Sequence, residues 1–234
     1  MANAYHEFED HEQPDEIYIY ETPMRIWHWL NALMVVTLTL TGILIGTPLP
    51  SYSGDPSTVY VMGWIRLVHL VSAYGFTVLW ILRVWWAFVG NVYAHQIFVP
   101  PFWSRRWCAG VLHQLRWTVT MTGEAKRYDG VSPLGQALIP FIYILPSLVL
   151  LVTGFGMLAE VAGHDSWQYH AFGWMRAVAV NTIDLHTYHR AAMWVMAMFA
   201  VMHVYAAVRD DVLSRQSVVS VMLSGYRFFK KVRR

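Results

Sequence analysis

The chain has 234 residues, of which 56% are hydrophobic and only 14% are charged, and it contains twelve Trp and thirteen Tyr. This composition is unusual for a soluble domain and typical of a membrane protein with aromatic belts at both lipid interfaces. The net charge is only +2, and no large cluster of Lys or Arg indicates nucleic acid as a partner. Because Cys108 is the single cysteine, the chain cannot form an intrachain disulfide, a cysteine-ligated iron–sulfur cluster or a CxxCH haem attachment.

The N-terminal segment, residues 6–16, is acidic and polar and lacks the basic start and apolar core of a signal peptide. After it, hydropathy predicts four transmembrane helices, over residues 26–46, 64–89, 134–158 and 185–209. Pro140 and Pro146 interrupt the third helix and should kink it. We therefore expect an all-α protein, an integral membrane bundle of four transmembrane helices that forms a single domain over residues 1–234.

Lys and Arg residues indicate the orientation of these helices. The second connection, residues 90–129, has five of them and the C-terminal tail has six, whereas the first connection, 47–63, has none and the third, 160–184, has only Arg176. Basic loops stay on the cytoplasmic side of a membrane, so we expect both termini and the middle connection in the cytoplasm. The end of the tail, residues 226–234, combines aromatic and basic residues and is expected to be a cytoplasmic amphipathic segment held against anionic membrane lipid.

Two histidines of the fourth span, His189 and His203, are the most informative pair in the chain. They are fourteen residues apart, so they lie on nearly the same helix face and about 21 Å apart along the axis. That separation suits two flat macrocycles stacked across a membrane, and ionisable residues inside a span usually have a functional reason. His28, near the cytoplasmic end of the first span, and His69, near the outer end of the second, supply a partner at each depth.

This arrangement predicts two haems with two axial imidazoles each. The pairs at matching depth are His69 with His189 on the outer side and His28 with His203 on the inner side. For His28 or His69 taken alone, a histidine that snorkels from the interface to water is an equally good interpretation.

Further residues are candidates for contact with the haems, namely Gly42, Arg66, Arg83 and Arg190. Gly42 follows His28 by fourteen residues, at the depth of the outer pair, where a glycine lets a porphyrin edge approach the backbone. Arg83 lies at the depth of the inner pair and is a candidate partner for a haem propionate or a quinone oxygen, while Arg66 and Arg190 flank the outer ligands. The alternatives are close helix packing for the glycine and headgroup contact for the arginines.

At these residues the chain resembles the b-type cytochrome subunit of membrane-bound Ni/Fe-hydrogenases. The first signature of that family is matched by residues 25–30 (Arg-Ile-Trp-His-Trp-Leu) and by the pair Thr41-Gly42. The second is matched by residues 186–190 (His-Thr-Tyr-His-Arg) and by Trp194, Phe199 and His203. The stretch 209–227 is also similar, and one departure is Ala191, where the family usually has a larger aliphatic residue.

The resemblance implies a multi-pass dihaem cytochrome b of the bacterial inner membrane that anchors a periplasmic hydrogenase and does not itself activate hydrogen. Its partners would be the small and large hydrogenase subunits. Electrons would leave the iron–sulfur small subunit, enter the outer haem b, cross to the inner haem b and reduce a quinone. Carried over residue by residue, the haem ligands are His28, His69, His189 and His203. The gamma subunit of membrane formate dehydrogenases has a similar architecture and is the alternative.

We expect quinone to bind near the inner haem, and the candidate contacts are Trp29, Asn31, Arg83, Tyr128 and Gln136. For each of these residues taken singly, a polar side chain that marks the membrane interface is the simpler interpretation. A different class of function stays open, in which the histidines form a proton relay in a transporter or the chain is a haem-free membrane anchor.

Overall fold

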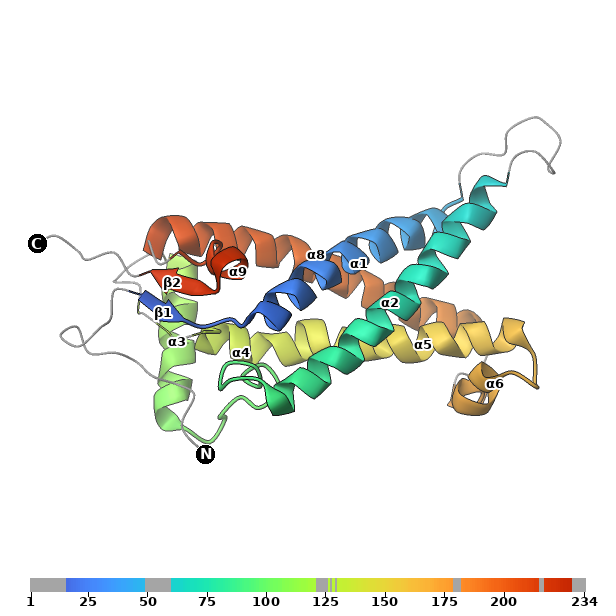
Figure 1. Cartoon of the computed structure of the whole chain (residues 1–234). Helices are drawn as coiled ribbons and strands as arrows, with labels where there is room; N and C mark the ends of the chain where they lie inside the picture. Colours follow the sequence, from blue (N-terminus) through green and yellow to red (C-terminus); the bar gives the residue numbers. More distant parts are fainter. Residues whose placement is uncertain are drawn as a thin grey trace, which may run out of the picture. The chain divides into compact units, whose positions relative to one another are not determined.

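The structure is a computed structural model that describes residues 16–48, 60–120, 126, 128, 130–178, 182–214 and 217–228. Four helical stretches in it are long and apolar enough to cross a membrane (Figure 1): α1 (Thr22–Gly46), α2 (Val61–Val89), the run from α4 to α5 (Pro133–Ala162) and α8 (Thr182–Ser214). The prediction of a membrane bundle with four spans is thereby confirmed. The orientation of the termini stays a prediction, and the acidic segment 6–15, the connection 49–59 and the last residues, 229–234, lie outside the described residues.

The third span changes helix type where the sequence places its prolines. It consists of α4 (Pro133–Ile139), the π-helical turn η1 (Pro140–Ile144) and α5 (Leu145–Ala162). Pro140 opens the π turn and Pro146 lies in the first turn of α5. Proline has no N–H to donate, so it is tolerated where the regular hydrogen-bond ladder is interrupted or just beginning. The expected break in the span therefore takes the form of a π turn.

The chain forms two compact units, and α1, α2 and α8 each contribute to both of them. Unit 1 contains Met1–Trp29, Ile81–Phe141 and Ala200–Arg234. Unit 2 contains Leu30–Trp80 and Ile142–Phe199. Of the predicted haem ligands, His28 and His203 belong to unit 1, and His69 and His189 belong to unit 2.

Unit 1 contains an antiparallel pair of strands that the all-α prediction does not include. β1 (Glu16–Tyr18) pairs with β2 (Tyr226–Phe228), so the described part of the predicted amphipathic tail is a strand. The short helix α9 (Val221–Ser224) leads into β2 through Gly225, which has a φ of +87°. A Cβ at Gly225 would lie 2.7 Å from the carbonyl oxygen of Tyr20, so this turn requires glycine.

Unit 1 also contains α3 (Arg105–Thr120), a helix in the connection for which the sequence indicated only basic charge. α3 buries Trp107, Gly110, Gln114 and Trp117 on one face and packs against α4. Two side-chain hydrogen bonds join these helices: Trp107 Nε1 donates to Gln136 Oε1 over 2.9 Å, and the amide of Leu134 donates to Gln114 Oε1 over 3.1 Å.

Unit 2 contains the short helices α6 (Trp167–Phe172) and α7 (Met175–Val178), which follow α5. α6 packs against α5 (Figure 1). The rings of Phe155 in α5 and Phe172 in α6 are stacked at a centroid distance of 5.0 Å. Small polar residues such as Ser147 and Thr153 are buried in this unit, whereas large apolar side chains such as Leu40 are exposed on its surface, as expected for spans that face lipid.

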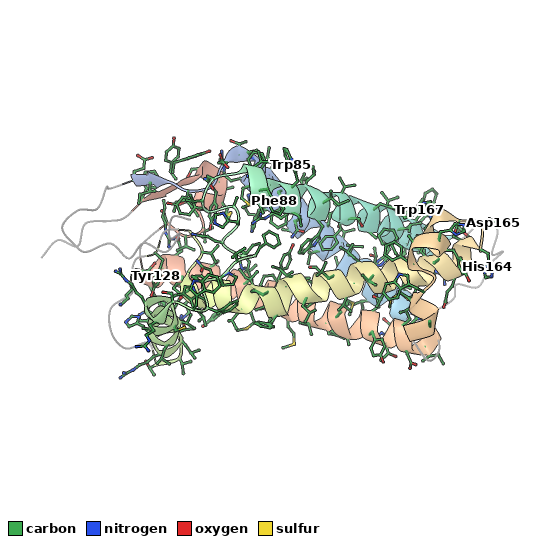
Figure 2. All side chains as sticks on the ribbon, turned by 90° about the horizontal axis from the view of Figure 1, so that it is seen from below. Trp85, Phe88, Tyr128, His164, Asp165 and Trp167 are labelled. Atoms are coloured by element: carbon green, nitrogen blue, oxygen red, sulfur yellow. The ribbon has the colours of Figure 1, made fainter. Side chains whose placement is uncertain are left out.

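Aromatic side chains are exposed near the ends of spans, as expected for a membrane interface. At the C-terminal end of α2, Trp85 and Phe88 are exposed, and Trp167 at the start of α6 is exposed in unit 2 (Figure 2).

Candidate functional site

The first candidate site lies in unit 2, where the rings of His69 and His189 face each other from α2 and α8. Their centroids are 6.5 Å apart and their planes make an angle of 63°. Two imidazoles that bind one metal ion from opposite sides hold their centroids about 6 Å apart, since each metal–nitrogen bond is about 2 Å long. The spacing of this pair therefore suits a shared metal ion.

A threonine hydroxyl orients each of these rings. His69 Nδ1 lies 2.8 Å from the Oγ1 of Thr41 in α1, and His189 Nδ1 lies 2.9 Å from the Oγ1 of Thr153 in α5. Each threonine also donates its single hydroxyl proton to a carbonyl one turn earlier in its own helix, that of Thr37 over 2.7 Å or Val149 over 2.5 Å.

The tautomer of both rings is assigned by counting protons. Each threonine hydroxyl has only one proton, and with that proton assigned to the backbone carbonyl, the oxygen accepts the hydrogen bond from the imidazole. His69 and His189 are therefore protonated on Nδ1, and Nε2 carries the lone pair that can bind a metal ion. Such an orienting hydrogen bond on the remote nitrogen accompanies nearly all metal-bound histidines.

A glycine follows each of these threonines and lies beside the oriented ring. A Cβ at Gly154 would be 3.3 Å from Cε1 of His189, and a Cβ at Gly42 would be 3.5 Å from Cε1 of His69. The same Thr-Gly arrangement thus occurs beside each of the two histidine rings, as Thr41-Gly42 and as Thr153-Gly154. In each pair one residue fixes the ring and the next leaves space beside it.

The same unit contains a cavity of about 1110 Å³ that is predominantly apolar. This volume slightly exceeds the range typical of small-molecule and cofactor sites, which is about 300–1,000 Å³. Helices α1, α2, α5 and α8 all line it, and it brings together five residues that the sequence predicted: Gly42, Arg66, His69, His189 and Arg190. His186 lines it as well, and Arg190 Nη2 donates to the carbonyl of Gly46 over 2.9 Å.

The second candidate site lies in unit 1, where His28 of α1 faces His203 of α8. The ring centroids are 6.2 Å apart and the planes make an angle of 53°, which again suits two ligands of one metal ion. His28 Nδ1 is buried and has no hydrogen-bond partner among the described residues. This ring therefore lacks the threonine contact that both rings of the unit 2 pair make.

Arg83 is a buried cation near the end of α2 in unit 1, with only 2% of its surface exposed. Its guanidinium lies 5.3 Å from the ring centroid of Trp27 and 5.0 Å from that of Phe98, and Nη2 donates to the carbonyl of Ala94 over 2.6 Å. These contacts tie the turn after α2 to the start of α1. The sequence-based role of Arg83 at a propionate or a quinone stays a prediction.

The four remaining quinone candidates do not all fall in one unit. Trp29, Tyr128 and Gln136 belong to unit 1, whereas Asn31 belongs to unit 2. Trp29 is half exposed and donates from Nε1 to the carbonyl of Met222 over 3.1 Å, and Tyr128 is buried.

Gln136 is also buried, and both ends of its amide are engaged. Its Oε1 accepts from Trp107, and its Nε2 donates to the carbonyl of Val131 over 2.8 Å. In unit 2, Asn31 Oδ1 accepts from the hydroxyl of Tyr143 over 3.0 Å. A quinone site at these residues stays a prediction.

Sequence reasoning missed Thr153 and Gly154 altogether, and it used Thr41 only as part of a motif. A signal was nevertheless present, because the dipeptide Thr-Gly occurs in the C-terminal third of both the first and the third span. Threonine inside an apolar span satisfies its own hydroxyl through a backbone carbonyl, so it gives no sign in the sequence of a second partner.

A bundle of apolar helices with facing histidines inside it is typical of the class of membrane cytochromes b. A family model described as prokaryotic cytochrome b561 matches residues 19–225. The chain belongs to this family and is a bacterial membrane protein with the four spans described above.

Curated relatives agree with this family. The chain is 48% identical over 214 residues to a protein of Rhizobium leguminosarum bv. viciae, with 92% of this chain and 90% of the relative covered. It is 42% identical over 213 residues to a protein of Cupriavidus necator, covering 91% and 87%. Both are named "Probable Ni/Fe-hydrogenase B-type cytochrome subunit".

A third relative, from Escherichia coli K12, is 39% identical over 220 residues and covers 91% of each chain. Its name is "Probable Ni/Fe-hydrogenase 1 B-type cytochrome subunit". These relatives confirm the resemblance that the sequence motifs indicated.

Proposed function

We propose that this chain is the membrane subunit that carries electrons from a Ni/Fe-hydrogenase through two haem b groups to quinone, and that it anchors the hydrogenase to the bacterial inner membrane. The observation that carries the proposal is the pair of facing imidazoles in each compact unit, at centroid distances of 6.5 Å and 6.2 Å. The names of the relatives point to a Ni/Fe-hydrogenase as the partner, and the family resemblance adds its small and large subunits.

The residues of unit 2 fit a haem. His69 and His189 would hold its iron through Nε2, and the large apolar cavity offers room for a macrocycle. Gly42 and Gly154 keep that room open beside the two rings. A bound haem supplies reversible one-electron transfer between ferric and ferrous iron.

Charged residues of the same cavity fit the polar edge of a haem. Arg66 and Arg190 line the cavity, and both are exposed, so their guanidinium groups can reach carboxylates at its rim. Arginine binds carboxylates through a planar fork of N–H donors, which suits a propionate.

In unit 1, His28 and His203 would hold the second haem. With both termini in the cytoplasm, His69 and His189 lie toward the periplasm, where electrons arrive, and His28 and His203 lie toward the cytoplasm. Quinone is then reduced near the inner pair, with Trp29, Asn31, Tyr128 and Gln136 as the contacts to test. Proton uptake on that side, coupled to electrons from the outer side, would contribute to the membrane potential.

Two alternatives predict different observations. The gamma subunit of a membrane formate dehydrogenase would have the same haem spectrum and a different partner. A proton relay or a haem-free anchor would have no haem spectrum at all, but it gives no reason for the apolar cavity beside His69 and His189.

The test is a reduced-minus-oxidised spectrum of the protein purified from haem-replete cells, together with identification of the proteins that co-purify. We expect the α-band of b-type haem, two haems per chain and the subunits of a Ni/Fe-hydrogenase. His69→Ala should lose one haem, whereas the control His164→Ala, in the turn before α6, should lose none. Absence of the α-band contradicts the cytochrome, and a formate dehydrogenase as the co-purified enzyme contradicts the hydrogenase partner.

A further inference from the structure

The two histidine pairs differ in what their Nδ1 atoms contact. Both rings of the unit 2 pair donate from Nδ1 to a threonine hydroxyl, at 2.8 Å for His69 and 2.9 Å for His189. In the unit 1 pair, the buried Nδ1 of His28 has no hydrogen-bond partner among the described residues. This asymmetry acts on the electronic character of the ligands, which is one of the means by which a protein sets haem potentials.

We infer that Thr41 and Thr153 are positioning residues that lower the reduction potential of the outer haem. The inference rests on the proposed function, since it needs a haem at each histidine pair. It adds to that function a cause for the direction of electron flow, from the outer haem to the inner one.

The physical reason lies in the hydrogen bond itself. When Nδ1–H donates to an oxygen, electron density shifts onto the ring and Nε2 becomes a more basic ligand. A more basic ligand stabilises ferric iron more than ferrous iron, because ferric iron carries the larger positive charge. The haem held by two such ligands therefore accepts its electron less readily.

The surroundings of the two threonine hydroxyls favour a role as hydrogen-bond acceptors for the imidazole N–H groups. Each donates its own proton to the carbonyl four residues earlier, that of Thr37 or Val149, and this leaves the oxygen lone pairs free for the imidazole. Thr41 and Thr153 are also buried, at 8% and 3% exposure, so water does not compete for these hydrogen bonds.

The sequence uses this device twice around one site. Thr41 with Gly42 in α1 faces the histidine of α2, and Thr153 with Gly154 in α5 faces that of α8. Because the two threonines act on different ligands of one iron, we expect their effects on the potential to add.

The experiment is a redox titration of the haems in the purified protein with Thr41→Val, Thr153→Val and the double substitution. The outer haem is identified as the one missing from His189→Ala. Loss of one hydroxyl should lower about tenfold the preference of the histidine ligands for ferric over ferrous iron. For one electron, this corresponds to an upward shift of about 59 mV in the reduction potential of the outer haem. The double variant should shift further, and the inner haem should keep its potential.

Two further variants separate ligand tuning from general packing. Thr41→Ser keeps the hydroxyl and should restore the original potential. Thr77→Val is the matched control, because Thr77 in α2 makes the same bond to a carbonyl four residues earlier, that of Ala73 over 2.7 Å. This control should leave both potentials unchanged.

The outcomes distinguish the inference from the proposed function. Two haems with unshifted or lowered potentials in both valine variants would overturn the inference and leave the proposed function standing. An equal shift in Thr77→Val, or no restoration in Thr41→Ser, would also overturn it. An unsubstituted protein that binds no haem would overturn both. Thr41→Val and Thr153→Val act on different histidine ligands. If one of these variants fails to bind the outer haem, the potential measured in the other variant still tests the inference.

Discussion

Arg83 offers a direct test of how unit 1 is held together. Its guanidinium makes cation–π contacts at 5.3 Å to Trp27 and 5.0 Å to Phe98, and it donates a hydrogen bond to the carbonyl of Ala94. A desolvated cation–π contact contributes about 2 kcal/mol, and a hydrogen bond from a charged donor contributes about 1.5–3 kcal/mol. A substitution that removes the buried charge also removes its desolvation cost, which offsets about half of this sum. We therefore expect Arg83→Met to lower the free energy of unfolding by about 3 kcal/mol.

The assay is unfolding of the detergent-solubilised protein by SDS, followed by tryptophan fluorescence. Arg83→Lys should have an intermediate effect, because lysine keeps the charge but lacks the planar group that stacks between two rings. Arg105→Met, at an exposed arginine of α3, is the matched control and should change little. An Arg83→Met protein within about 1 kcal/mol of the unsubstituted one would refute this reasoning.

Two more substitutions test the unit 2 site and the packing of α3. Gly154→Leu places a branched side chain against the ring of His189, where even a Cβ would be 3.3 Å from Cε1, so one of the two haems should be lost. The haem-to-protein ratio measures this, and full occupancy would speak against the site. Trp107→Phe removes the 2.9 Å hydrogen bond to Gln136 and should destabilise the protein by about 1–2 kcal/mol in the SDS assay. An unchanged unfolding transition would show that this hydrogen bond does not contribute to stability.

The spans and the depths of the histidines follow from the sequence because both depend on local periodicity. An apolar run long enough to cross a membrane is a property of composition, and the helix rise converts the spacing of His189 and His203 into depth. Both histidines lie in the single helix α8, and each faces another histidine that the sequence also selected.

The strand pair and the threonine contacts, which the sequence did not predict, depend on contacts between distant residues. β1 and β2 pair residues more than 200 positions apart, such as Glu16 with Phe228, and hydropathy carries no information about such pairing. The threonine partners of the unit 2 ligands are separated from them by 28 and 36 residues. Hydropathy does not reveal helix α3, because charged residues share its sequence with the buried Trp107 and Trp117.

The central claim is that two histidine pairs hold two separate haems, and it is tested most directly by counting haem in two single variants. His189→Ala and His203→Ala should each retain one haem per chain, and the retained haems should differ in midpoint potential, because each variant loses a different one. Retention of both haems in either variant, or loss of both haems from a folded protein, would contradict the account.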